Sequence, residues 1–600
     1  MNFLKQTFAS IVGTIAGLLL FVTLGATGLV FLLFAATAPK IEPQVKNKSI
    51  LVFDLATQIR DSAPQTNIQQ VFSGDAQSTL KLRDVLDALE KAANDDRIVG
   101  LLLDGRRENV GSGYAVMAEV RDAIANFQAQ GKKIIAYDVA WSEREYYLAS
   151  IADEVLLNPM GIMEFNGMSS EQMFLKGAFD KYGIGVQVIR VGDYKSAVEP
   201  FTREDLSPAN RQQTQALLTD LWTKFLSTVG ESRDLDPQYL QQVADQKGFI
   251  EPEEAKKIKL VDEIAYFDNL TAKLRELTGE STNKTESFRQ IKFDDYVSDF
   301  QAPVSNANMA KNTIAVVYAE GSIVGGKGNI EQIGSDRFAQ EFRELRENDN
   351  VKAIVLRVNS PGGSATASEV ILREILLTKK EKPVIVSMGN VAASGGYWIS
   401  AGADQIFAEE NTITGSIGVF GLLPNIQEIG NNHGITWDVV QTGKFADINS
   451  SVRPKTDAEL AIYQKSVAQV YNLFLKKVSE YRNLPKEKVQ QIAQGRVWSG
   501  KEALNIGLID QIGGLESAIA FAAKKAELGE NWKIAEFPQN KTWESELAER
   551  LFKVEALQVA KPVDPLSSQL QKIRQELALV QSFDDPRSIY ARLPFEFNID

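Results

Sequence analysis

The sequence predicts two tandem homologous α/β domains behind a single N-terminal membrane helix, and three observations support this fold class. The first is an internal repeat, because five stretches in the first half of the chain resemble five stretches in the second half, in the same order. The second is an alternation of short Val/Ile/Leu-rich runs with helical patterns, which is typical of a mainly parallel sheet. The third is an uncharged apolar run at the N-terminus.

Residues 1–40 are interpreted as a membrane anchor. No charged side chain occurs between Gln6 and Pro39, and the apolar run IVGTIAGLLLFVTLGATGLVFLLF is longer than the about 20 residues that span a bilayer. A secretory signal has a shorter apolar region. The triplet ATA resembles a cleavage site, but Pro39 follows it directly. We therefore expect residues 8–36 to cross the bilayer uncleaved, while lysines on both sides leave the orientation open.

Two repeated units follow, over residues 41–300 and 301–540. The matching stretches are KNKSILVFDL and KNTIAVVYAE, RIVGLLLDG and KAIVLRVNS, YYLASIADEVLL and YWISAGADQIFA, GIGVQVIRVGDYK and GITWDVVQTGKFA, and EEAKKIKLVDEI and KEALNIGLIDQI. The third and fourth pairs share an offset of 251 residues. The polar stretch 301–312 is expected to link the units. Residues 541–600 have no counterpart in the first unit, and two amphipathic patterns predict a helical extension there.

Composition excludes several kinds of site. The chain has no cysteine, which rules out disulfides, thiol nucleophiles and Cys-based metal sites, and its single histidine, His433, rules out multi-His sites. A net charge of −13 disfavours nucleic-acid binding, because phosphate contacts dominate that affinity. The stretch GSIVGGKG resembles a phosphate-binding loop, but Gly328 stands where a Ser or Thr would meet magnesium. No metal and no cofactor are therefore expected.

The stretch VAASGGYWIS places Ser394 before two glycines and just after the apolar run PVIVSM, as expected for a nucleophile at a strand-to-helix turn. Such a serine needs a base, which is usually histidine. The 251-residue offset places Glu143 opposite Ser394 and Ala446 opposite Lys195. Each unit thus lacks what the other retains. We therefore predict one composite site, with Ser394 from the second unit as the nucleophile and Lys195 from the first unit as the general base.

A lysine acts as a base only if its ammonium form is destabilised. Burial between the two units would lower the pKa of Lys195 from its ordinary value of about 10.4. The neutral amine would then accept the Ser394 proton during attack on a carbonyl group. Ser416, in the glycine-rich turn TGSIGVFG, is expected to orient Lys195 by accepting a hydrogen bond.

Acyl transfer also requires donors for the oxyanion. The turn SPGG follows a predicted strand, and its glycines permit backbone N–H groups to converge on a ligand. Gly395 lies at a predicted helix N-terminus, where N–H groups are free. The predicted oxyanion donors are the backbone N–H groups of Gly362 or Gly363, together with that of Gly395.

These motifs resemble those of the signal peptide peptidase SppA family in its long form with two tandem domains. The resemblance covers nearly the whole chain and rests on NSPGGSATAS, VAASGGYWIS, TGSIGVFG and GDYKSAVEPF. It implies Clp-protease/crotonase-like domains and a membrane-anchored serine endopeptidase with a Ser–Lys dyad. The family's nucleophile, base and lysine-orienting serine fall on Ser394, Lys195 and Ser416.

The resemblance also implies a biological setting. The substrates would be signal-peptide remnants and similar extended apolar peptides. The chain would form a homotetramer whose active sites face inward. The anchor would cross the inner (plasma) membrane once and hold the catalytic domains on the extracytoplasmic side.

Two other classes stay open on the residues alone. A crotonase-like acyl-CoA enzyme would share the fold and the oxyanion loop, but such enzymes usually rely on carboxylates rather than on a serine and a lysine. A catalytically inert membrane scaffold would not need an intact dyad. Thioester and peptide substrates would separate the first class from a peptidase.

Overall fold

The computed structural model describes residues 45–62, 79–107, 111–280, 287–300, 312–329, 331–538, 585 and 587–593. The predicted anchor and most of the predicted linker lie outside these stretches, and so do the two amphipathic patterns of the C-terminal segment. Within the described stretches, no helix combines the length and the apolar character needed to cross a membrane.

The first unit is built on a seven-stranded sheet with the order β10-β1-β4-β5-β6-β8, and β9 also pairs with β6. Strands β1, β4, β5 and β6 are parallel, and their apolar runs are buried on both faces, which explains why they lack a period of two. The bounds are β1 Ser49–Asp54, β4 Ile98–Asp104, β5 Lys133–Trp141, β6 Glu154–Phe165, β8 Gly248–Ile250, β9 Glu263–Ile264 and β10 Gln290–Lys292.

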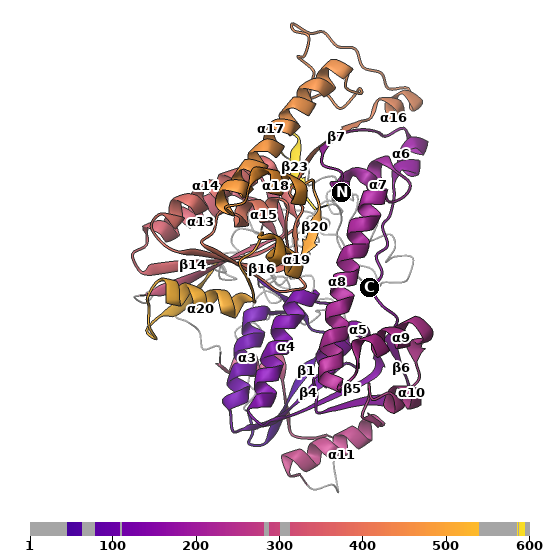
Figure 1. Ribbon diagram of the computed structural model, residues 1–600, viewed down its shortest axis with the longest axis vertical. Coiled ribbons are helices and arrows are strands. Elements are labelled where there is room, and N and C mark those ends of the chain that lie inside the picture. Colours follow the sequence, from indigo (N-terminus) through magenta and orange to yellow (C-terminus); the bar gives the residue numbers. More distant parts are fainter. Residues whose placement is uncertain are drawn as a thin grey trace, which may run out of the picture.

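Helices cover both faces of this sheet (Figure 1). The longest, α8, begins where Ser207 accepts a hydrogen bond from the Asn210 N–H and Pro208 occupies the first turn. The bounds are α3 Leu82–Asn94, α4 Tyr114–Ala129, α5 Glu143–Ala149, α6 Lys176–Tyr182, α7 Glu199–Thr202, α8 Pro208–Arg233, α9 Pro237–Lys247, α10 Pro252–Lys257, α11 Phe267–Thr278 and α12 Phe293–Phe300. A 3-10 turn spans Ser196–Val198, and a small ribbon joins β2 (Gln58–Arg60) to β3 (Thr79–Lys81).

The second unit has an eight-stranded sheet with the order β20-β18-β16-β14-β11-β22, and β17 pairs with β16 and β21. Its strands are β11 Thr313–Glu320, β14 Val351–Ser360, β16 Val384–Ala393, β17 Gln405–Ala408, β18 Ile413–Gly415, β20 Val497–Ser499, β21 Gln511–Ile512 and β22 Lys533–Phe537. Its helices are α13 Ser335–Glu347, α14 Ala365–Lys379, α15 Gly395–Ser400, α16 Gln427–Asn432, α17 Asp457–Tyr481, α18 Lys486–Ile492, α19 Gly500–Ile506 and α20 Leu515–Lys525.

The two large sheets are copies of one another. The order β22-β11-β14-β16 repeats β10-β1-β4-β5, and the antiparallel edge strand β20 repeats β8. Equivalent buried tyrosines make the same hydrogen bond: Tyr146 Oη donates to Leu260 O at 2.5 Å, and Tyr397 Oη donates to Leu508 O at 2.8 Å. The repeat seen in the sequence is therefore a repeat of the fold.

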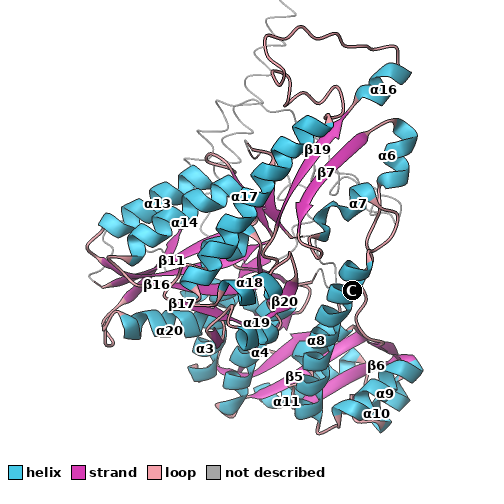
Figure 2. Cartoon of the chain, turned by 45° about the horizontal axis from the view of Figure 1, so that its top comes forward, coloured by secondary structure: helices cyan, strands magenta, loops and turns pink. Residues whose placement is uncertain are grey.

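A third, six-stranded sheet combines segments that are far apart in the sequence, in the order β13-β12-β15-β23-β19-β7. Its strand β7 comes from the first unit and pairs antiparallel with β19 of the second unit (Figure 2). Its strand β23 comes from the C-terminal segment, so the described part of that segment is a strand and not a helix. The bounds are β7 Gly185–Val191, β12 Ser322–Val324, β13 Gln332–Gly334, β15 Gly362–Ser364, β19 Val419–Asn425 and β23 Ile589–Arg592.

The third sheet also shows that the two units interlock. The first unit does not end at its own sheet, because β7 and the turn after it lie against the second unit. This crossing brings the residues after β7, including Lys195, next to the turn that follows β16.

Candidate active site

Lys195 and Ser394 meet at the interface between the two units. The Lys195 Nζ lies 2.7 Å from the Ser394 Oγ, although 199 residues separate them in the chain. Both residues are completely buried, with 0% of their surface exposed. The structure therefore brings together, within one chain, the two residues that the complementary losses of the repeat singled out.

The backbone around Ser394 is strained in a way that exposes the hydroxyl to the lysine. Ser394 precedes α15 with φ 56° and ψ −110°, a conformation that costs energy for a residue with a Cβ. Its N–H donates to Gly415 O at 2.8 Å, which holds the turn. Gly396 is required beside it, because a Cβ there would lie 2.6 Å from Ser360 O. The double glycine thus permits the tight strand-to-helix turn.

Lys195 is fixed by its backbone as well as by its amine. The preceding Tyr194 N–H donates to Gln494 O at 3.0 Å. Gly495 has φ 81°, and a Cβ on it would lie 2.7 Å from the Lys195 Cα, so only glycine allows this approach. A Cβ on Gly418 would lie 3.3 Å from the Lys195 Cδ. Gly418 belongs to the glycine-rich turn TGSIGVFG that the sequence analysis singled out, whereas the sequence reasoning missed Gly495, which carries no local signal that links it to residue 195.

Three oxygens surround the amine of Lys195. Its Nζ contacts the Ser394 Oγ, the Ser416 Oγ at 3.0 Å and the Ser416 carbonyl oxygen at 3.2 Å. Burial lowers the pKa of Lys195 well below its ordinary value, because desolvation penalises the ammonium form. A neutral amine at this position can accept a proton from the serine hydroxyl.

Ser416 is held in its own strained turn. Its φ is 49°, its N–H donates to Arg496 O at 2.7 Å, and its hydroxyl reaches Gly495 O at 3.3 Å. Ser416 therefore lies where the sequence expected it, beside the amine of Lys195.

The three glycines predicted as oxyanion donors lie together next to Ser394. Gly362 has φ 93°, and a Cβ on it would come within 2.6 Å of the Gly395 nitrogen. The Gly362 N–H donates to Ser360 Oγ at 3.1 Å, so it is already engaged in this structure. Gly363 pairs with Ala591 of β23, and Gly395 opens α15.

Strand β23 is the part of the site that the sequence reasoning overlooked. It lies between β15 and β19 and pairs antiparallel with both. A Cβ on Gly395 would lie 2.9 Å from the Ala591 carbonyl oxygen, and a Cβ on Gly362 would overlap the same oxygen. The Leu593 N–H donates to Pro361 O at 2.7 Å. The only local signal was a short β-prone run, IYAR, far from the motifs that it joins.

The corresponding place in the first unit is filled differently. The Glu143 carboxylate accepts hydrogen bonds from the Asn166 N–H at 2.6 Å and the Gly167 N–H at 3.0 Å. Ala446, opposite Lys195 in the repeat, lies in an exposed stretch of the second unit. His433 is also exposed, and its ring contacts only Ile429 O among the described residues. Neither unit holds a second serine–lysine pair at these positions.

The fold and this site define the class of protein. The family model described as Clp protease matches residues 305–413, and the model described as peptidase family S49 matches residues 126–281 and 377–529, one stretch in each unit. The protein is therefore a serine protease with an α/β Clp-protease-like fold. The chain belongs to peptidase family S49.

Curated relatives support the same family along most of the chain. Protease 4 of Haemophilus influenzae is 36% identical over 522 residues, which cover 84% of each chain. Protease 4 of Salmonella typhi is 35% identical over 567 residues, 91% of this chain and 90% of that protein. The chloroplastic serine protease SPPA of Arabidopsis thaliana is 33% identical over 496 residues, 82% of this chain and 71% of that protein. The resemblance to the SppA family is thus confirmed.

Proposed function

We propose that this protein is a membrane-anchored serine endopeptidase that degrades cleaved signal peptides and similar apolar peptides, with Ser394 as nucleophile and Lys195 as general base. The observation that carries the proposal is the fully buried 2.7 Å contact between the Lys195 Nζ and the Ser394 Oγ. An acyl-CoA enzyme or an inert scaffold would not need this contact, and family S49 membership supports the peptidase.

The proposed reaction has two halves. Neutral Lys195 accepts the Ser394 proton as the Oγ attacks the peptide carbonyl, and the resulting ammonium then protonates the leaving amine. Neutral again, Lys195 takes a proton from the water that attacks the acyl-serine, and the ammonium returns a proton to the Ser394 Oγ as the ester bond breaks and the acid product leaves. Ser416 holds the amine in line, and the backbone N–H groups of Gly395 and of Gly362 or Gly363 stabilise the oxyanion.

The position of β23 supports an extended substrate. Strand β23 lies between β15 and β19 and pairs with both, so this space accommodates an extended chain. A substrate peptide that took the place of β23 in the same register would pair with both β15 and β19. The side chains of β23 enter apolar surroundings from both units. Tyr590 belongs to an apolar cluster with Ala197, Val198, Phe201, Phe420 and Leu422, and Leu593, directly after β23, belongs to an apolar cluster with Leu217, Leu221, Ala393, Ile413 and Val497. Apolar, extended peptides match these surroundings.

The repeat supports the proposed homotetramer. Strand β7 of the first unit crosses to the second unit, but its counterpart in the second unit, residues 434–446, forms no strand and is exposed. Apolar side chains are among those exposed, with Ile435 at 54% and Val440 at 98%. If the first unit of a second copy packed against residues 434–446, it would bury these apolar side chains. First and second units would then alternate from one chain to the next around the oligomer.

The anchor and its location complete the proposal. Residues 8–36 would hold the protein in the inner (plasma) membrane with the catalytic units on the extracytoplasmic side. The long uncharged run supports the anchor.

The proposal is tested with the full-length protein in detergent. The substrates are a synthetic apolar signal peptide and a folded globular protein, with the Ser394→Ala variant as the control. We expect the wild type to cut the peptide and spare the folded protein, and the variant to cut neither. Peptide cleavage by Ser394→Ala would exclude Ser394 as the nucleophile, and cleavage of the folded protein would contradict the substrate class.

A further inference from the structure

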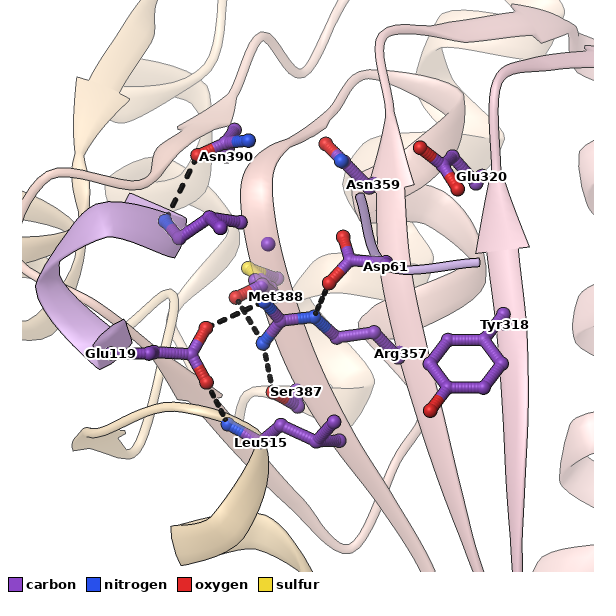
Figure 3. A network of polar contacts seen from close by, with 12 residues as sticks. Asp61, Glu119, Tyr318, Glu320, Arg357, Asn359, Ser387, Met388, Asn390 and Leu515 are labelled. Atoms are coloured by element: carbon purple, nitrogen blue, oxygen red, sulfur yellow. Dashed lines mark hydrogen bonds and ion pairs between the residues drawn. The ribbon is translucent and has the colours of Figure 1, made fainter. Parts of the chain in front are cut away.

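Arg357 is a completely buried arginine in the middle of the unit interface (Figure 3). Its guanidinium donates to Asp61 Oδ1 at 2.7 Å, to Glu119 Oε1 at 2.6 Å and to Ser387 Oγ at 2.7 Å. The two carboxylates come from the first unit, whereas Arg357 and Ser387 come from β14 and β16 of the second unit. One side chain therefore joins both units and two neighbouring strands.

The position of Arg357 in the sheet connects it to the candidate active site. Arg357 lies three residues before Ser360, where β14 ends and the turn with the oxyanion glycines begins. Its partner Ser387 lies seven residues before Ser394 on β16. The two strands pair in register at Arg357 and Ser387, and the register shifts between Val358 and Ser360. Arg357 thus holds the last regular part of both strands before they diverge into the site.

The first unit is tied to the same strands by further contacts. The second carboxylate oxygen of Glu119 accepts the Leu515 N–H at 2.6 Å, at the start of α20. Gly514 allows this approach, because a Cβ there would overlap the Glu119 carboxylate. The Val116 N–H, one turn earlier on α4, donates to Asn390 Oδ1 at 3.1 Å, four residues before Ser394. Helix α4 is therefore docked on the strand that leads to the nucleophile.

The repeated fold does not require this arginine. The loops entering β4 and β14 make the same hydrogen bond, from the Ile98 N–H to Asp95 O and from the Val351 N–H to Asn348 O. Counted from these residues, Asp104 occupies the place of Arg357, and it pairs locally with Arg106 at the strand end. A buried cation is thus specific to the unit that carries the serine.

We propose that Arg357 is a positioning residue for the peptidase reaction, which sets the distance between the Ser394 turn of the second unit and Lys195 of the first unit. The inference rests on the proposed function of that pair. Lys195 and Ser394 are delivered by different units, so their contact depends on how the units dock. Arg357 fixes that docking at the strands nearest the site, and it does so without touching substrate.

Charge balance decides how the inference is tested. Burial opposes the charge on Arg357, but Asp61 and Glu119 outweigh burial and raise the pKa of Arg357 above its ordinary value. Removing Arg357 alone would leave two buried carboxylates without a cation, which destabilises a protein strongly, whereas removing all three charges can be close to neutral. The informative variant therefore carries Asp61→Asn, Glu119→Gln and Arg357→Met together.

The experiment compares the rate-versus-pH profiles of the full-length triple variant and the wild type on an apolar peptide. We expect kcat to fall about a hundredfold while KM changes by less than about twofold. We also expect the rising limb to move to higher pH, because looser docking admits water to Lys195 and restores the charged amine. A smaller folded fraction would lower the profile without moving it along the pH axis.

The matched control is another ion pair between the units, Lys81–Glu536, at 2.7 Å. The double variant Lys81→Met with Glu536→Gln should keep the wild-type profile. A folded triple variant with an unmoved limb would overturn the positioning role, and so would a control that shifts equally. If Ser394→Ala remained active, the proposed function itself would fail, which is a separate outcome.

Discussion

The turn at Ser394 and the turn at Glu143 occupy the same place in two copies of one fold, yet only the first forms a serine–lysine pair. The first turn joins β16 to the short helix α15, and the second joins the equivalent strand β5 to the short helix α5. At the first, Ser394 adopts φ 56° and its side chain makes no capping hydrogen bond. At the second, Ser142, which directly precedes Glu143 and caps α5, adopts φ −81° and forms a capping box with Glu145.

The difference shows what a site requires beyond the fold. A relaxed capping box satisfies the helix terminus of the first unit, and Glu143 turns its carboxylate to two N–H groups of its own unit. In the second unit, two glycines replace bulky residues and the serine is held in a strained turn, where it faces the amine of Lys195. The two units share the same sheet and helix arrangement, but only the second has a strained backbone at this turn.

The largest expected effect compares these two turns directly. Ser394→Ala should reduce kcat for peptide cleavage by at least about a thousandfold, as expected when a nucleophile is removed. Glu143→Ala should keep kcat within about threefold of the wild type, because among the described residues the Glu143 carboxylate accepts its hydrogen bonds from Asn166 and Gly167 of its own unit. Steady-state kinetics on an apolar peptide measure both values. Equal losses would mean that both turns take part in the reaction.

The second prediction concerns Ser416, whose counterpart at the 251-residue offset is the buried core residue Phe165. Ser416→Ala removes one of the oxygens that hold the Lys195 amine, and kcat should fall about tenfold to a hundredfold, the loss expected for one buried hydrogen bond to a positioned group. The control is Ser479→Ala in α17, which removes a hydroxyl that donates to the Leu484 carbonyl oxygen just after that helix. A Ser416→Ala enzyme with wild-type kcat would remove Ser416 from the site.

The third prediction concerns pH. Burial lowers the pKa of Lys195, so kcat/KM should rise about tenfold per pH unit until the amine is neutral and should then level off. Burial also raises the pKa of Glu143, but that carboxyl is not part of the dyad. The rising limb should therefore survive Glu143→Gln. If residual activity in Lys195→Ala kept the same limb, another group would be responsible for it.

The smallest expected effect is on stability. At pH values between the lowered pKa of folded Lys195 and its ordinary value of 10.5, the Lys195 amine takes up a proton when the protein unfolds. The free energy of unfolding should therefore rise with pH there, by at most about 1.4 kcal/mol per pH unit. Lys195→Met removes this penalty, so its Tm should exceed that of the wild type, with the gap widest at low pH. The exposed substitution Lys476→Met should show no such gap.

The features of this structure that could be predicted are those that correspond to a local or repeated pattern in the sequence. The two units follow from matched apolar runs, and the pairing of Ser394 with Lys195 follows from what each copy lost. The reasoning did not find β23, Gly495 or the ion cluster around Arg357. These features depend on contacts between segments far apart in the chain, and nothing in the short sequences IYAR or GRVW marks their partners. The hydrogen bond from the Gly362 N–H to the Ser360 Oγ is another contact that the sequence reasoning did not anticipate.

The C-terminal strand also has a consequence for kinetics. Because β23 belongs to the enzyme's own chain and already pairs with β15 and β19, a peptide that bound as proposed would have to compete with it for those strand edges. A competing segment within the same chain acts as an effective concentration that a free peptide has to exceed. The apparent affinity for substrate is then the intrinsic affinity divided by that competition. If the enzyme is anchored as proposed, a peptide confined to the same bilayer would exceed that effective concentration more readily than one diluted in water.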